Sequence, residues 1–105
     1  MPAETNTDIE HKRAAIKYPN DLMLQRRERG LNRKQTASLI GRSVSSIGRY
    51  ERGSVLPPLL TALKLEILYR TQLGSLYERL YQALKSELRA KEEAVRAISK
   101  PKGGT

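Results

Sequence analysis

The sequence predicts an all-α protein, a helical bundle of four to five helices of which the last is long. Apolar residues recur at every third or fourth position in successive segments, which is the spacing of one face of a helix. Residues that favour helix starts and ends separate these segments, and no segment alternates polar and apolar residues as a strand would. A chain of 105 residues is expected to form one domain with tails.

The first helix is expected over residues 21–29. Pro19 stops any helix that precedes it, and Asn20 and Asp21 are residues that commonly cap a helix start. Gly30 follows the segment and suits the left-handed conformation in which many helices end.

The second and third helices are expected over residues 33–40 and 44–52. Asn32 and Gln35 have the spacing of a capping box, and Ser43 is the expected cap of the third helix. Each of the two helices is followed by a glycine that can end it, and these are Gly41 and Gly53. The side chains expected to pack between them are Ala37, Ile40, Ile47 and Tyr50.

Two further helices complete the prediction, over residues 58–69 and 73–98. The first of these is expected to face the core with Leu59, Leu60, Leu63 and Ile67. The second carries a heptad-like row of apolar residues, interrupted by Lys91, that consists of Leu73, Tyr77, Leu80, Leu84, Leu88, Val95 and Ile98. These patterns divide the chain into a flexible N-terminal arm (1–18), a domain (19–72), a long C-terminal helix (73–99) and a disordered tail (100–105).

The charge of the chain favours an acidic partner. The formal net charge is +9, and residues 24–53 alone hold eight Lys and Arg against two Glu. Nucleic acid is the commonest acidic partner, and an anionic membrane surface is the rival. Glutamates interspersed along the last helix argue against a membrane surface.

The composition also excludes several kinds of site. There is no cysteine and a single histidine, His11, so neither a disulfide nor a multi-histidine metal site is expected. We expect no metal, no cofactor and no enzymatic activity, since no nucleophile–base pair or Gly-rich phosphate loop is evident. No apolar run is long enough to span a membrane and no secretory signal is evident, so a cytoplasmic protein is expected.

The short link between the second and third helices predicts a DNA-binding helix-turn-helix at residues 32–53. Residues 40–43 form this link and include a glycine, as such motifs do. In these motifs the second helix enters the major groove and presents its N-terminal residues to base edges. The candidates for base contact are Val44, Ser45 and Arg49, and the small Ser46 and Gly48 would allow a close approach.

Residues 22–69 resemble the helix-turn-helix domain of the lambda repressor and Cro family. The residues that carry the resemblance are Ala37, Gly41, Ser43, Ile47, Glu51 and Gly53. The resemblance implies a lambda-repressor-like bundle, base contacts from Val44, Ser45 and Arg49, and a structural ion pair between Arg26 and Glu51. Arg33 stands where the family usually has a glutamine that touches phosphate.

Further residues around the motif are expected to contact the DNA backbone, which fixes register without carrying sequence information. These are Arg33, Lys34, Arg42, Ser43, Ser46 and Arg52.

The expected function is sequence-specific binding of double-stranded DNA by a homodimer. Its two recognition helices would enter successive major grooves about 34 Å apart, on a pseudo-palindromic operator. The expected dimer contacts are Leu73, Tyr77, Leu80, Leu84 and Leu88. The resemblance implies a regulator of transcription, more often a repressor than an activator. The alternative is a protein-interaction module, such as an antitoxin or adaptor, whose C-terminal helix binds another protein.

Overall fold

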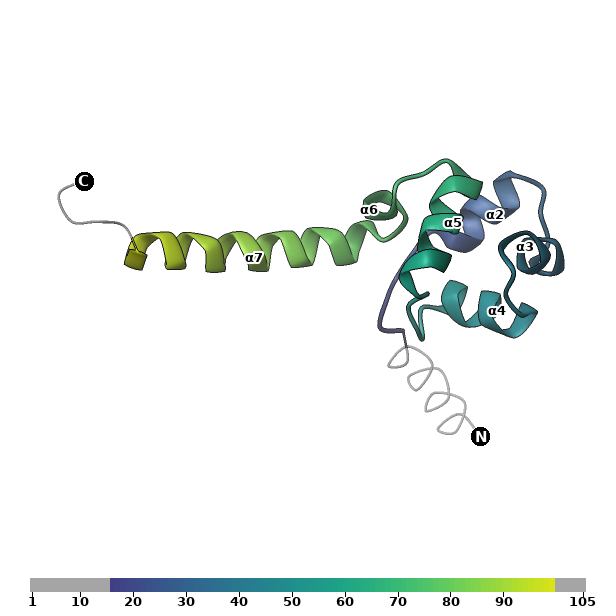
Figure 1. Ribbon diagram of the computed structural model, residues 1–105, viewed down its shortest axis with the longest axis horizontal. Helices are drawn as coiled ribbons and strands as arrows, with labels where there is room; N and C mark the ends of the chain where they lie inside the picture. The colour runs from purple at the N-terminus through teal and green to yellow at the C-terminus, as the bar shows by residue number, and fades with distance from the viewer. Residues whose placement is uncertain (1–15, 100–105) are drawn as a thin grey trace, which may run out of the picture.

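The computed structural model describes residues 16–99 as an all-helical chain (Figure 1). The helices are α2 (Leu22–Glu28), α3 (Arg33–Ile40), α4 (Val44–Arg52), α5 (Leu59–Tyr69), α6 (Leu73–Leu76) and α7 (Glu78–Ser99). Helices α2 to α6 pack together, and α7 projects from them as a single long rod. The predicted fold class is confirmed. Residues 1–15 of the arm predicted over 1–18, and the tail predicted over 100–105, lie outside the described residues.

The bounds of α3 and α4 are those predicted from the capping residues. The Asn32 side chain accepts from the backbone N–H of Gln35, and the Gln35 side chain accepts from that of Asn32, so the capping box is complete. The Ser43 side chain accepts from the backbone N–H of Ser46 at the start of α4. Gly41 ends α3 with φ at 72°, a left-handed conformation that glycine adopts without steric cost.

The core lies between all five packed helices. The four residues predicted to pack between α3 and α4 are all buried, at 4% exposure or less. They share the core with side chains from the other helices, namely Leu22, Leu65, Tyr69, Leu76 and Tyr77. The core therefore draws on every helix from α2 to α6, while most of α7 lies outside it.

Helix α5 turns a different face to the core than the one predicted. The predicted inward residues Leu59, Leu60, Leu63 and Ile67 are exposed by 69, 74, 39 and 73%. The residues that it buries are Thr61, Ala62, Leu65 and Tyr69. The prediction was wrong because α5 is apolar on nearly all sides, so spacing alone could not identify its inner face.

The predicted single helix over residues 73–98 is interrupted at Tyr77. Tyr77 leaves the helical conformation, with φ −118° and ψ 49°, and separates the short α6 from α7. The break allows Leu76 and Tyr77 to enter the core, where they are 0% and 7% exposed. The backbone carbonyl of Leu76 also accepts from the N–H of Asp21 at 2.9 Å. The packed domain therefore extends past residue 72 and includes α6.

The N-terminal boundary of the domain also shifts relative to the prediction. The backbone N–H groups of Lys17 and Tyr18 both donate to the carbonyl of Gly53, at 2.9 and 3.0 Å. Tyr18 packs against the core as a partly buried side chain. Residues 16–18 are therefore part of the domain rather than of a free arm.

Replacing Tyr77 with phenylalanine is expected to raise the free energy of unfolding by about 1 kcal/mol. Among residues 16–99, the Tyr77 hydroxyl is buried without a hydrogen-bond partner, a condition that costs stability. The variant keeps the buried ring and removes only the unpaired hydroxyl. Urea unfolding of both proteins measures the change, and a clear loss of stability would show that the hydroxyl is bonded in solution.

The same hydroxyl predicts a pH dependence. Burial raises the pKa of Tyr77 to about 12 from its ordinary value of 10.0. Between these two values the unfolded chain loses the proton while the folded chain keeps it, so this contribution to stability falls as pH rises. Below pH 10 the hydroxyl is protonated in both the folded and the unfolded chain, so none of this stability is lost there. Stability of Tyr77→Phe should accordingly decline less over this interval than that of the unsubstituted protein, as measured by urea unfolding at each pH.

Candidate nucleic-acid interface

Helix α4 has one side in the core and one side open. Ile47 and Tyr50 anchor it, with exposures of 2% and 3%. The predicted base-contacting residues Val44, Ser45 and Arg49 are all exposed, Val44 by 47%. At 100° per residue the three positions lie within about 140° of one another around the helix, and Ser45 and Arg49 are only about 40° apart. The open side runs from the first residue of α4 to its middle.

A small polar network supports the first turn of α4. The Ser43 hydroxyl lies 2.9 Å from the Ser46 hydroxyl, and an Arg49 terminal nitrogen lies 3.4 Å from the latter. Ser46 is only 6% exposed. Burial and these bonds occupy the hydroxyl of Ser46, so they do not favour the phosphate contact predicted for this residue. Its position instead favours an orienting role toward Arg49.

Gly48 leaves room for another side chain of its own helix. Gly48 is buried, and a side-chain carbon added there would lie 3.1 Å from a terminal nitrogen of Arg52. The guanidinium of Arg52, which lies one turn further along the same helix, occupies the space next to this glycine. Gly48 thus leaves room for the guanidinium of Arg52 to lie across α4.

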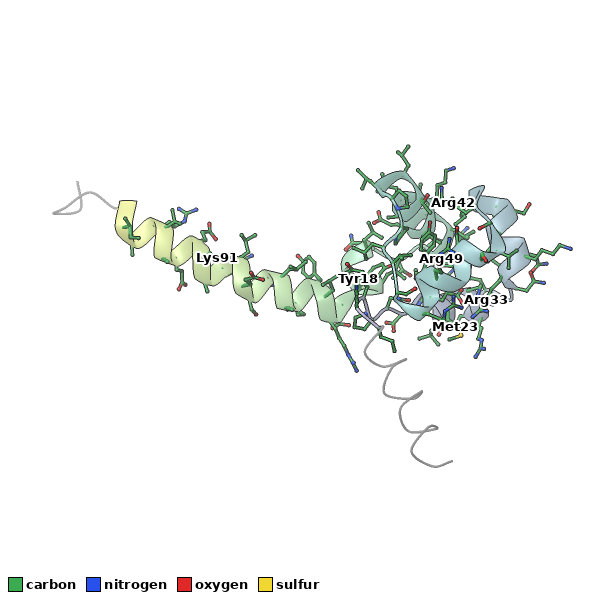
Figure 2. The ribbon with its side chains drawn as sticks, turned by 90° about the horizontal axis from the view of Figure 1, so that it is seen from below. Tyr18, Met23, Arg33, Arg42, Arg49 and Lys91 are labelled. Carbon is green, nitrogen blue, oxygen red and sulfur yellow. The ribbon has the colours of Figure 1, made fainter. Side chains whose placement is uncertain are left out.

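Basic side chains surround the open side of α4. Figure 2 shows Arg33, Arg42 and Arg49 on the same face of the domain, contributed by α3, the turn and α4. Lys34, Arg42 and Arg52 are exposed, as is the N-cap Ser43. The predicted phosphate-contacting residues other than Ser46 thus lie at the surface, and Arg33 has a side chain exposed by 40%.

A buried ion pair joins α2 to the end of α4. Two guanidinium nitrogens of Arg26 lie 2.5 and 3.1 Å from the two carboxylate oxygens of Glu51. The third nitrogen donates to the carbonyl of Leu31 at 3.0 Å. The side chains of Arg26 and Glu51 are 9% and 2% exposed. The hydrogen bond to Glu51 raises the pKa of Arg26, so this guanidinium is held in its charged form.

Arg33 joins the same carboxylate from α3. Its Nε lies 3.1 Å from the Oε1 atom of Glu51. One acidic side chain thus fixes arginines from two helices against the recognition helix. This second contact was missed from the sequence, where Arg33 was expected to serve phosphate alone.

Two further side chains hold the helices of the motif in place through hydrogen bonds that the sequence did not predict. Asn20 donates from its side chain to the carbonyls of Tyr18 and Tyr50, both at 2.9 Å, and accepts from the N–H of Leu22. It therefore ties the start of α2 to the end of α4. Lys64 of α5 donates to the carbonyl of Ile40 at 3.3 Å, at the end of α3. Both contacts join residues more than 20 positions apart, which no local pattern reveals.

The described part of the chain offers no group of three or more His, Cys, Asp or Glu that could hold a metal ion. Of the helices between residues 16 and 99, none is long and apolar enough to cross a membrane.

Two helices joined by a tight turn, with an anchored second helix whose open side is ringed by arginines, define a helix-turn-helix DNA-binding domain. A sequence model of the helix-turn-helix family matches residues 22–76, which is just over half of the chain. The protein therefore belongs to the helix-turn-helix family of the lambda repressor and Cro type. No curated protein and no solved structure matches the chain.

Proposed function

We propose that α4 enters the major groove of double-stranded DNA and reads its sequence. The observation that carries this proposal is the open side of α4, where Val44, Ser45 and Arg49 are exposed while the opposite side is anchored in the core. Arg49 can bond both acceptors of a guanine, and Val44 can contact a thymine methyl group. A good bidentate contact discriminates against the wrong base by about 1–3 kcal/mol.

The surrounding polar groups would supply affinity rather than specificity. The phosphate contacts are assigned to Arg33, Lys34, Arg42, Ser43 and Arg52. Each phosphate neutralised by an arginine or lysine releases counterions, so the affinity should fall steeply as salt rises. These contacts hold the register of α4 in the groove.

The chain would act as a homodimer on a pseudo-palindromic operator, with half-sites one helical turn or a multiple of it apart. Of the residues first assigned to the dimer, Leu84 and Leu88 are exposed by 54% and 66%. Tyr77 lies in the core of its own domain, and Leu73 and Leu80 pack against that core as partly buried side chains, so these three offer a partner less surface than Leu84 and Leu88 do. The biological role would be control of transcription in the cytoplasm, by repression through occlusion of a promoter.

Selection of bound fragments from random DNA tests this proposal. The full chain should enrich one sequence, arranged as two inverted half-sites. A titration with the enriched site and with a scrambled site of the same length should show a preference of at least about a thousandfold. Equal affinity for both would contradict sequence-specific binding.

A second function has one specific observation in its favour. Helix α5 exposes four large apolar side chains on the face away from the core, at positions 59, 60, 63 and 67. Exposed apolar patches of this kind are typical of protein–protein contacts. An antitoxin or adaptor that binds another protein would use such a surface. The test is a variant with polar residues at all four positions. If this variant keeps its DNA specificity, the apolar surface of α5 is not needed for DNA recognition and is free to bind a protein.

A further inference from the structure

Helix α7 carries a row of apolar side chains that its own domain does not cover. Tyr81, Leu84, Leu88 and Ile98 are exposed by 51, 54, 66 and 85%. Numbered as a heptad, Tyr81 and Leu88 take position a, while Leu84 and Ile98 take position d together with Lys91. This is the spacing of a helix that packs lengthwise against another helix.

The row begins at an apolar groove where α7 leaves the domain. The groove has a volume of about 230 Å³ and includes Leu56, Pro57, Leu73, Tyr77, Tyr81 and Leu84. Its lining joins the loop before α5 to α6 and to the first turns of α7. The groove and the row thus form one continuous apolar surface.

We propose that a second copy of this chain covers this surface, with the two α7 helices antiparallel and the end of each seated in the groove of the other. The proposal deepens the dimer of the proposed function and rests on it. In this register Ile98 of one copy lies level with Tyr81 of the other, and Lys91 lies level with Leu88. Apart from Lys91, apolar a and d positions then face one another along the overlap.

The charges beside the row favour the antiparallel arrangement. In a parallel pair, Lys91 would face its own counterpart, and Glu87 at position g would face Glu92 at position e of the partner helix. Both contacts are between like charges. In the antiparallel pair, position e faces position e, so Lys85 of each copy lies beside Glu92 of the other. Two favourable ion pairs thus replace the repulsive contacts.

This arrangement has a consequence for the operator. The starts of the two α7 helices would be about 34 Å apart, for about 23 residues at 1.5 Å per residue. Each domain lies beyond the start of its own α7 (Figure 1). The two recognition helices are therefore farther apart than one turn of DNA, and the half-sites are expected to be separated by more than one turn.

Site-specific crosslinking tests the orientation, because the chain has no cysteine of its own. One chain carries Tyr81→Cys and another carries Ile98→Cys, and the two are oxidised alone and mixed, without DNA. The mixture should form a disulfide-linked heterodimer, while neither chain alone should crosslink, because like positions are about 26 Å apart. Crosslinking of Ile98→Cys with itself would show a parallel pair. Absence of any crosslink would also overturn the proposal.

A charge reversal provides an independent readout that leaves the groove intact. Glu92→Lys should weaken dimerisation on the order of tenfold in an antiparallel pair, because both ion pairs become repulsive. In a parallel pair it should instead strengthen dimerisation, by pairing with Glu87. The matched control is Glu93→Lys, which makes the same charge change on the outer side of α7. Sedimentation equilibrium measures both.

Adding Lys85→Glu to Glu92→Lys should restore the original dimer affinity. Failure to restore it, or a strict monomer in the unsubstituted protein, would overturn the proposal. Both measurements are made without DNA, so a failure of DNA recognition would leave their results unchanged. DNA specificity without the predicted crosslink would likewise contradict only the antiparallel pair.

Discussion

Replacement of Glu51 with alanine is expected to lower the free energy of unfolding by about 3–4 kcal/mol. The Glu51 carboxylate is 2% exposed and accepts from both Arg26 and Arg33. Its removal leaves the guanidinium of Arg26, which is itself only 9% exposed, without its counter-charge. Breaking one side of a buried ion pair is costly because the remaining charge keeps its desolvation penalty. Urea unfolding monitored by circular dichroism measures the loss.

The matched control is Glu28→Ala, which removes an exposed carboxylate at the end of α2 and should change stability little. Glu51→Gln should fall between the two, because an amide oxygen can still accept a hydrogen bond but carries no charge. An unchanged melting temperature for Glu51→Ala would contradict the assignment of this pair as the tie between α2 and α4.

Replacement of Gly53 with alanine is expected to cost at least about 2 kcal/mol. Gly53 has φ at +74°, where a side chain is strained. A side-chain carbon there would also lie 2.6 Å from the carbonyl oxygen of Tyr18, which is backbone and cannot rotate away. The carbonyl of Gly53 itself accepts from Lys17 and Tyr18, so any shift loosens the N-terminal segment.

Gly30→Ala is the control for backbone strain alone. Gly30 has a similar φ of +67°, but an added carbon would meet nothing within 4 Å. It should cost only about 1 kcal/mol. Equal losses for the two variants, measured by urea unfolding, would show that the segment before α2 does not pack against Gly53 in solution.

The bounds of α3 and α4 could be predicted because the signals that set them are local. Asn32, Gln35 and Ser43 bond to backbone within three residues, and Gly41 needs only its own conformational freedom. The open side of α4 followed from the same bounds together with the resemblance to a known family. Local chemistry thus sufficed for the motif itself.

What the sequence could not reveal depends on contacts between distant segments. The inner face of α5 depends on how Leu65 and Tyr69 meet the core, and the break at Tyr77 depends on a pocket formed by other helices. Likewise, Ser46 reads as a polar surface residue until the fold buries it. Where spacing allows a residue to be either buried or exposed, tertiary packing decides which it is.

Helix α4 is proposed to read base edges, with Arg49 making part of the contacts that discriminate between bases. The most direct measurement is the affinity of the unsubstituted protein and Arg49→Ala for the selected operator and for every single base-pair change in it. We expect Arg49→Ala to lose discrimination of about 1–3 kcal/mol at one base pair in each half-site and to keep it elsewhere. Uniform weakening at all positions would make Arg49 a phosphate contact and would contradict base recognition by this side chain.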